Sequence, residues 1–262
     1  MKNCSELTAE EAREIRFLFT DIDDTLTQNG KLDPGAYEAL WILKEEGIKV
    51  IPVTGRPAGW CDCIIRQWPV DAVIGENGAF AFFLENGKKQ SLFHPDFHDD
   101  TSGKKLQKIK TEILEQVNGA AVSRDQPYRL SDLAIDFREE GNLSLDDAVR
   151  IRDIAESFGA RAKISSIHVN IWLGNFDKYG MTKHLCRLRW NLELPDEAGK
   201  IVFCGDSPND EPMFEAFPLS FAVGNLRNYE HLLTKKPAFI SKNEYGQGFR
   251  EIVLEIVEKI KK

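Results

Sequence analysis

Short apolar runs alternate with amphipathic segments in the first third of the chain, and this pattern predicts an α/β fold. Apolar residues dominate 15–21 and 48–53, while apolar positions recur with helical spacing over 33–46, before Gly47. A strand, a helix and a second strand in this order predict two parallel strands joined by a right-handed crossover.

The same alternation continues after the second strand and returns late in the chain. A helix is predicted over 58–67 and a strand over 71–75. Further strands are predicted over 200–206 and near 221–223, and an amphipathic helix over 247–261. We therefore expect a doubly wound, mostly parallel, Rossmann-like sheet built from both outer thirds.

The middle third has a different pattern. Alternating apolar and polar residues over 134–137 and 167–172 predict strands, and they are interleaved with helical patterns over 103–117 and 144–158. This composition is typical of an inserted α+β domain that acts as a lid. The predicted division is a core of residues 1–82 and 176–262 and an inserted cap of residues 83–175.

Composition and charge indicate which kinds of molecule the protein can bind. The chain has 262 residues, of which 42% are hydrophobic and 29% charged, as in ordinary globular proteins. A net charge of −8 argues against general binding to nucleic acid or to anionic membranes. No apolar run approaches the ~20 residues that span a bilayer, and five scattered cysteines form no disulfide pattern. We expect a cytoplasmic monomer or homodimer whose partner is a small molecule.

Polar residues that could take part in catalysis or bind a metal follow three of the predicted strands. Asp21 and Asp23 come at the end of the first strand, Thr54 follows the second, and Asp206 ends the strand at 200–206. Ligands of open α/β sheets bind beyond the carboxyl ends of the strands. We therefore expect these side chains to converge on one site.

The residue types favour phosphate chemistry with a hard cation. Mg²⁺ prefers oxygen ligands, which Asp21, Asp206 and Asp210 could supply. A carboxylate that attacks a phosphate dianion must overcome like-charge repulsion, so a cation, a lysine and neutral donors are needed. Thr54 and the backbone amides beside Gly55 could be the neutral donors.

Three segments resemble motifs of the haloacid dehalogenase superfamily: DIDDTLT at 21–27, VTGR at 53–56 and GDSPND at 205–210. The ENGA turn at 76–79, the large insertion and the late AVGN at 222–225 resemble its type IIB branch, which includes sucrose-phosphate phosphatases and phosphomannomutases. The resemblance covers essentially the whole chain.

The resemblance implies an aspartyl-phosphate mechanism. Asp21 would be the nucleophile, and Asp23 would protonate the leaving alcohol and then activate the hydrolytic water. Thr54 and Gly55 would hold the phosphoryl oxygens. The implied Mg²⁺ ligands are Asp21, Asp23 (through its backbone carbonyl), Asp206 and Asp210.

The superfamily's catalytic lysine is expected where the chain returns from the insertion. Lys178 lies at that junction, near a helix N-terminus that also attracts phosphate, and we favour it over Lys183. The sequence departs from the superfamily pattern at Asp24, where many relatives have glycine, and at Tyr179, which separates the lysine from Gly180.

The predicted function is Mg²⁺-dependent hydrolysis of a small phosphorylated metabolite, with sugar phosphates as the leading class by resemblance. A phosphomutase and a non-catalytic phosphometabolite-binding module are the alternatives. Predicted substrate contacts from the core are Arg56, Glu76, Asn77 and Asn209. Candidate contacts from the cap are Arg129, Arg138, Ser165, Ser166, His168 and Asn170. A second metal site within His94–Asp100 is a weaker hypothesis than a polar loop.

Overall fold

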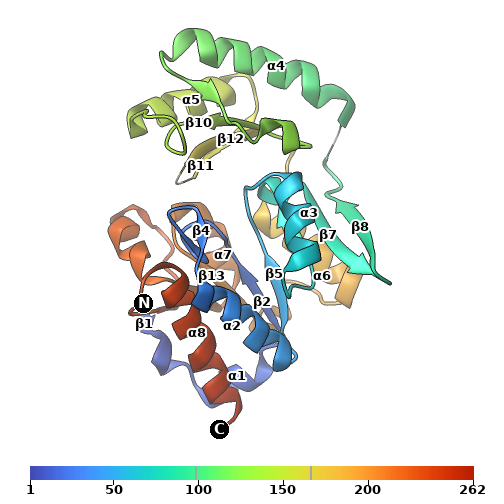
Figure 1. The fold of residues 1–262 in the computed structure, drawn as a ribbon, viewed down its shortest axis with the longest axis vertical. Helices are drawn as coiled ribbons and strands as arrows, with labels where there is room; N and C mark the ends of the chain where they lie inside the picture. Colours follow the sequence, from blue (N-terminus) through green and yellow to red (C-terminus); the bar gives the residue numbers. More distant parts are fainter. Residues whose placement is uncertain (98, 166) are drawn as a thin grey trace.

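The fold is built on a six-stranded sheet, seen in a computed structural model that describes residues 1–97, 99–165 and 167–262 (Figure 1). Its strand order is β1-β15-β14-β13-β2-β5, and every neighbouring pair is parallel. The predicted doubly wound sheet is thus confirmed. The strands are β1 (Lys2–Asn3), β2 (Phe17–Thr20), β5 (Lys49–Pro52), β13 (Ile201–Gly205), β14 (Leu219–Ala222) and β15 (Phe239–Ile240).

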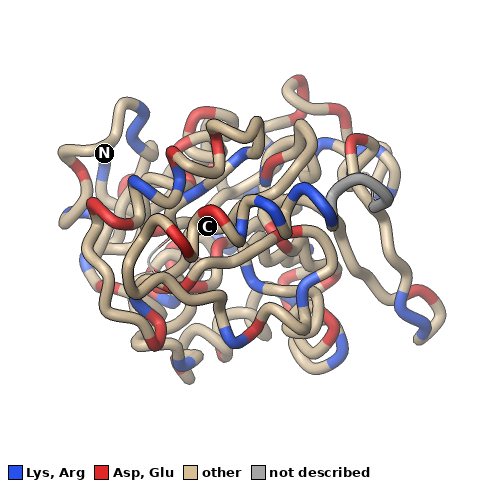
Figure 2. Tube along the Cα trace, turned by 90° about the horizontal axis from the view of Figure 1, so that it is seen from above, with Lys and Arg blue, Asp and Glu red and all other residues tan. Residues whose placement is uncertain are grey.

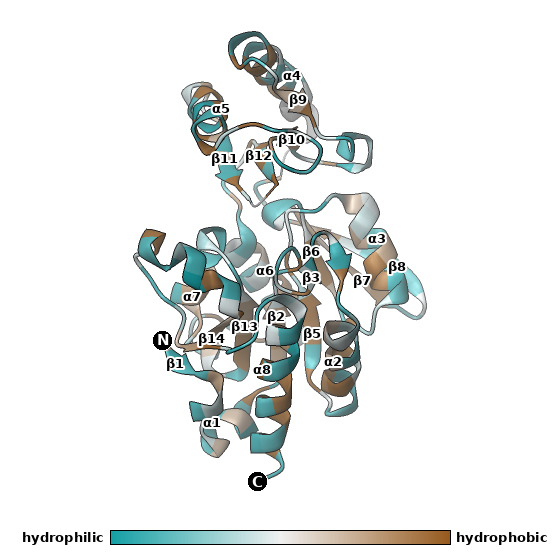
Figure 3. Ribbon diagram, turned by 60° about the vertical axis from the view of Figure 1, so that its left-hand side comes forward, coloured by the Kyte–Doolittle hydropathy of each residue, from teal (hydrophilic) through white to brown (hydrophobic). Residues whose placement is uncertain are grey.

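Helices cover both faces of this sheet because its strands are apolar on both faces. In β2, Leu18 packs with the cluster that holds α1 (Ala9–Glu14), α2 (Pro34–Glu45) and α8 (Tyr245–Ile260). Phe19 points to the opposite face, toward α6 (Lys178–Trp190) and α7 (Glu211–Ala216). The apolar colouring of the central strands is visible in Figure 3.

A hairpin extends the core beyond β5. Strand β6 (Val73–Gly75) follows α3 (Ala58–Gln67) and meets the sheet through a parallel bridge between Val53 and Ile74. Strands β7 (Phe80–Glu85) and β8 (Lys88–Phe93) pair antiparallel beside β6. The predicted start of the insertion, residue 83, falls inside β7. A second, short hairpin, β3 (Thr27–Gln28) and β4 (Lys31–Leu32), follows the predicted nucleophile loop.

The inserted unit, residues 99–165 and 167–172, is called the cap below. Its antiparallel sheet has the order β11-β12-β10-β9, with β9 at Ala121–Val122, β10 at Leu133–Asp136, β11 at Arg161–Ile164 and β12 at His168–Trp172. Helices α4 (Asp99–Gln116) and α5 (Leu145–Ser157) lie on the side of this sheet away from the core (Figure 1). The sheet therefore faces the carboxyl ends of the core strands.

Two surface properties bear on possible partners. Lys and Arg are interspersed with Asp and Glu along most of the trace (Figure 2). Within the described ranges, none of the helices combines the length and the apolar character needed to cross a membrane.

Candidate active site

Three carboxylates meet where the central strands end. Asp21 follows β2 and Asp206 follows β13, and these two strands are direct neighbours. Asp210 lies four residues later and its Oδ2 accepts a 3.1 Å hydrogen bond from the Asp206 amide. One ligating oxygen from each of the three lies within 4.8 Å of the others, and all three residues are buried. The convergence predicted for Asp21, Asp206 and Asp210 is present in the structure.

Lys178 is the cation inside this cluster. Its Nζ lies 2.6 Å from Asp21 Oδ1 and 2.8 Å from Asp210 Oδ1, and the residue is 7% exposed. It is the first residue of α6, whose preceding Asp177 accepts a hydrogen bond from the Gly180 amide. Lys183, on the same helix, is exposed and lies above the Tyr179 ring. The structure places Lys178, and not Lys183, among the carboxylates.

Gly78 allows α6 to begin at this point. Gly78 has a φ of +107°, and a Cβ on it would lie 2.1 Å from the Asp177 carbonyl oxygen. A larger residue would push the start of α6 away from the turn that follows β6. The position of Lys178 thus depends on a glycine one hundred residues earlier.

The cluster carries more negative than positive charge in a buried environment. Burial, followed by repulsion from Asp210 and Asp23, raises the pKa of Asp21 to about 8 against the opposing effect of Lys178. Burial and the neighbouring carboxylates also raise the pKa of Asp206 well above its usual range. Burial alone would lower the pKa of Lys178, but Asp21 and Asp210 outweigh it and raise the pKa, so the lysine stays charged. This donor set, oxygen-only and anionic, fits a divalent hard cation.

Asp23 is held by Arg56 in a fork of hydrogen bonds. Arg56 donates from Nε and Nη2 to the Asp23 carboxylate over 3.0 and 2.8 Å, and from Nη1 to Glu139 of the cap over 2.8 Å. Glu139 also contacts His168 Nε2 at 2.9 Å. A hydrogen bond from His168, together with Arg56, lowers the pKa of Glu139 to about 2. Arg56, predicted to contact substrate, therefore also links the core to the cap.

Two predicted residues are engaged in holding loops. Thr54 is buried and its Oγ1 accepts a 3.0 Å hydrogen bond from the Arg56 amide. Glu76 is fully buried, and its carboxylate accepts from the amides of Ala58 and of Leu130, over 3.0 and 2.8 Å. Neither lines the cavity described next, and Glu76 ties the turn after β6 to both α3 and the cap.

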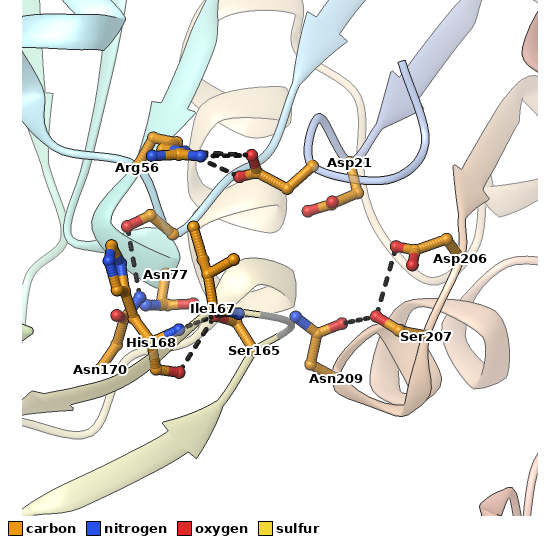
Figure 4. Close-up of a pocket in the computed structure, with 12 residues that line it drawn as sticks. Asp21, Arg56, Asn77, Ser165, Ile167, His168, Asn170, Asp206, Ser207 and Asn209 are labelled. Carbon is orange, nitrogen blue, oxygen red and sulfur yellow. Dashed lines mark hydrogen bonds and ion pairs between the residues drawn. The ribbon is translucent and has the colours of Figure 1, made fainter. Parts of the chain in front are cut away.

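A cavity lies between the carboxylate cluster and the cap (Figure 4). Its volume is about 20 Å³, which accommodates a group about the size of one water molecule. Core residues on its wall are Asp21, Asp23, Gly55, Arg56, Asn77, Asp206, Ser207 and Asn209. The cap contributes Ser165, Ile167, His168 and Asn170. Residues of the cap thus form one wall of the site.

Other cap candidates have different surroundings. Arg129 is paired with Asp125 and Asp132 and donates to the Gly55 carbonyl over 3.0 Å. Arg138 lies above the ring of Phe137. Ser166 lies outside the described residues.

Several residues near the site were not predicted from the sequence. Ser207 and Ile167 line the cavity, Glu139 joins Arg56 to His168, and Thr25 donates from Oγ1 to Asp206 over 3.3 Å. Ser207 and Thr25 belong to the motifs at 205–210 and 21–27, so motif membership could have identified them. No local signal marks Glu139, because its partners lie on other segments.

The second metal hypothesis gains no support from the described residues. His94 Nδ1 accepts a 3.1 Å hydrogen bond from the Asp96 amide, and His98 lies outside the described part of the chain. Among the described residues, only Asp21, Asp206 and Asp210 come together as a possible metal site.

Comparison with known proteins defines the class. The sequence profile of the haloacid dehalogenase-like hydrolases matches residues 18–147. A phosphoglycolate phosphatase of Methanobrevibacter smithii is 26% identical over 245 residues, covering 93% of this chain and 99% of that protein. A phosphoglycolate phosphatase of Methanothrix thermoacetophila is 29% identical and covers 91% and 96%.

Solved structures share the fold. A Thermoplasma acidophilum protein superposes with a TM-score of 0.73 at 21% identity, covering 93% of this chain and 98% of that one. The sucrose-phosphatase of Synechocystis sp. PCC6803 gives 0.64 at 15% identity, covering 94% and 98%. Fold and site together define a capped hydrolase of the haloacid dehalogenase type. The chain is a haloacid dehalogenase-like hydrolase, and it is a phosphatase.

Proposed function

We propose that this phosphatase is Mg²⁺-dependent and hydrolyses small phosphomonoesters through an aspartyl-phosphate on Asp21. The observation that carries the proposal is the buried cluster of Asp21, Asp206 and Asp210 around Lys178, at the carboxyl ends of the central strands. A cation site beside one lysine is what a carboxylate needs in order to approach a phosphate dianion.

Mg²⁺ would be held by the carboxylates of Asp21 and Asp206 and the backbone carbonyl of Asp23. Asp210 would bind it directly or through its water ligands. When bound, it supplies positive charge that offsets the charge of the phosphoryl oxygens and of the nucleophile. Lys178 donates to the nucleophile and stays protonated in the presence of its two carboxylates. Gly55 lies on the cavity wall, where its backbone amide would add a neutral donor.

The reaction divides into two displacements. In the first, an Asp21 oxygen forms a bond to phosphorus, the ester P–O bond breaks, and Asp23 gives its proton to the leaving oxygen. In the second, Asp23 takes a proton from water, the water oxygen bonds to phosphorus, and the Asp21 P–O bond breaks. Arg56 holds Asp23 as a carboxylate, the form that takes a proton from water in the second step, while the cap limits access of bulk water.

Sugar phosphates are the leading substrate class by resemblance. Phosphoglycolate is the second candidate, supported by curated relatives that align over nearly their whole length. A cytoplasmic location and a monomeric or homodimeric state stay predictions from the sequence.

The test is phosphate release from 4-nitrophenyl phosphate with and without Mg²⁺. Activity should require the metal and be lost in Asp21→Asn, and activity that survives either change would refute the mechanism. Incubation of a hexose 1-phosphate with a bisphosphate activator separates the mutase alternative, since isomerised sugar phosphate would then form faster than free phosphate. Binding of many phosphometabolites without any turnover would instead support the non-catalytic alternative.

A further inference from the structure

Two buried amide groups in the cavity have an atom without a hydrogen-bond partner. Asn77 is 8% exposed and Asn170 is 3% exposed, and both line the cavity. In the described part of the chain, Asn77 Nδ2 and Asn170 Oδ1 are the buried side-chain polar atoms that lack a partner. Such atoms are rare in folded proteins because a buried, unpaired polar group is costly, so their presence on a cavity wall points to a ligand.

The two amides come together over Gly55. Asn77 comes from the core turn after β6, with a left-handed φ of 57°, and its backbone amide donates to the Thr54 carbonyl. Asn170 comes from β12 of the cap and donates from Nδ2 to the Gly55 carbonyl over 3.3 Å. That bond fixes the Asn170 amide and leaves its Oδ1 as an acceptor.

Gly55 makes this approach possible. A Cβ at this position would lie 2.6 Å from Asn170 Nδ2 and 3.2 and 3.3 Å from Asn77 Oδ1 and Nδ2. One donor from the core and one acceptor from the cap therefore lie beside the backbone that we expect to hold the phosphate. Figure 4 shows both asparagines across the cavity from Asp206.

We propose that Asn77 and Asn170 form a subsite for a hydroxyl group of the substrate, on the carbon adjacent to the one that bears the phosphate. A hydroxyl can accept from Asn77 Nδ2 and donate to Asn170 Oδ1 at once, whereas a carboxylate can only accept and would face the Asn170 oxygen. The inference rests on the proposed phosphatase function and narrows its substrate class to phosphorylated polyols and sugars.

The charges around the subsite agree with this preference. Arg56, the guanidinium on the cavity wall, already pairs with Asp23 and Glu139. Lys178 already pairs with Asp21 and Asp210. A leaving group that carries a carboxylate would meet cations that are already neutralised, while a hydroxyl needs none.

Three probes carry different groups beside the ester carbon and test the subsite: propane-1,2-diol 1-phosphate has a hydroxyl there, n-propyl phosphate has none, and 2-phosphoglycolate has a carboxylate. We expect kcat/KM for the diol phosphate to exceed that for each of the others by roughly ten- to a hundredfold, since a probe without the hydroxyl leaves Asn77 Nδ2 and Asn170 Oδ1 unpaired. Equal values, or a preference for 2-phosphoglycolate, would overturn the proposal.

Substitutions test whether the two asparagine side chains cause the preference for the diol phosphate. Asn77→Leu and Asn170→Leu should each bring the ratio of diol phosphate to n-propyl phosphate close to one. Asn118→Leu, the same change at an exposed position after α4, should keep the wild-type ratio. A ratio that persists in both cavity variants would overturn the assignment, and either variant alone suffices if the other does not fold.

Binding separates this inference from the catalytic proposal. Calorimetric titration of the Asp21→Asn protein with the same probes and Mg²⁺ measures the preference without turnover. If the wild type releases no phosphate from 4-nitrophenyl phosphate, the phosphatase mechanism fails, yet the order of the binding constants still decides whether the subsite exists. Equal binding of the three probes contradicts the subsite even in an active phosphatase.

Discussion

Replacement of Lys178 by methionine should destabilise the protein and inactivate it. The side chain is buried and its ammonium group contacts two buried carboxylates, Asp21 and Asp210. Methionine keeps much of the volume and removes the charge. The loss of one partner from a buried ion pair costs about 3–5 kcal/mol, because the remaining charge is left uncompensated. The rate of phosphate release should fall at least 10²–10³-fold, roughly as when a preorganised donor is removed from a reacting site.

The penalty should depend on pH in a defined direction. Without the lysine, the pKa of Asp21, already raised to about 8 by burial, rises further. Protonation of Asp21 at lower pH then removes its uncompensated charge. The difference in unfolding free energy between wild type and Lys178→Met should therefore shrink as the pH is lowered from about 8 to about 5.

The matched control is Lys183→Met on the same helix. Lys183 is exposed, so its replacement should change the unfolding free energy by about 0.5 kcal/mol or less. Urea unfolding without Mg²⁺ measures stability, and phosphate release measures activity. If Lys178→Met unfolds at the wild-type midpoint, or Lys183→Met is the more damaging change, the assignment of the buried lysine is refuted.

Three further predictions follow from the site. Burial raises the pKa of Asp21 to about 8 in the folded protein. The contribution of this residue to stability is therefore fully present below its pKa in the unfolded chain and is lost as the pH rises through about 8. Because Mg²⁺ competes with protons for the carboxylate, the rise in Tm on addition of Mg²⁺ should be larger at about pH 8 than at about pH 5. Asp24 has a φ of 58°. Asp24→Gly and Asp24→Ala remove the same side-chain interactions, but only alanine is strained at this φ, so the alanine variant should be about 1 kcal/mol less stable than the glycine variant in thermal unfolding; equal stability would refute the backbone argument. The Glu139 side chain is 33% exposed, so Glu139→Gln should weaken cap closure by only about 1 kcal/mol, measured as a roughly fivefold higher KM, and an unchanged KM would contradict its role.

The core could be predicted from sequence because its signals are local. The strands of a sheet covered on both faces are continuous apolar runs, such as 15–21, and the catalytic carboxylates follow them directly. The hairpin at β7 and β8 also has a local signal. Asn86 and Gly87 both have positive φ in a two-residue turn, as expected for an Asn-Gly hairpin. The predicted boundary at residue 83 overlooked that turn.

The partners of the polar residues could not be predicted in the same way. Glu76 was expected to contact substrate, but its carboxylate accepts hydrogen bonds from the amides of Leu130 and Ser131, more than fifty residues away. Arg56 likewise contacts Glu139 of the cap. These pairings exist only because the cap is docked on the core, and no periodicity or motif encodes that contact.

Arg56 connects two properties of the site that the sequence presents separately. Its guanidinium donates to Asp23, the proposed proton-transfer group, and to Glu139 of the cap at the same time. The planar fork fixes the orientation of Asp23 only while the guanidinium is itself held in place. Glu139 contributes to that restraint when the cap covers the cavity, and Trp60 contributes through its ring, 4.4 Å from the guanidinium carbon. Orientation of the proton-transfer group and exclusion of water therefore depend on the same closed arrangement, so a substrate small enough to let the cap close gains both.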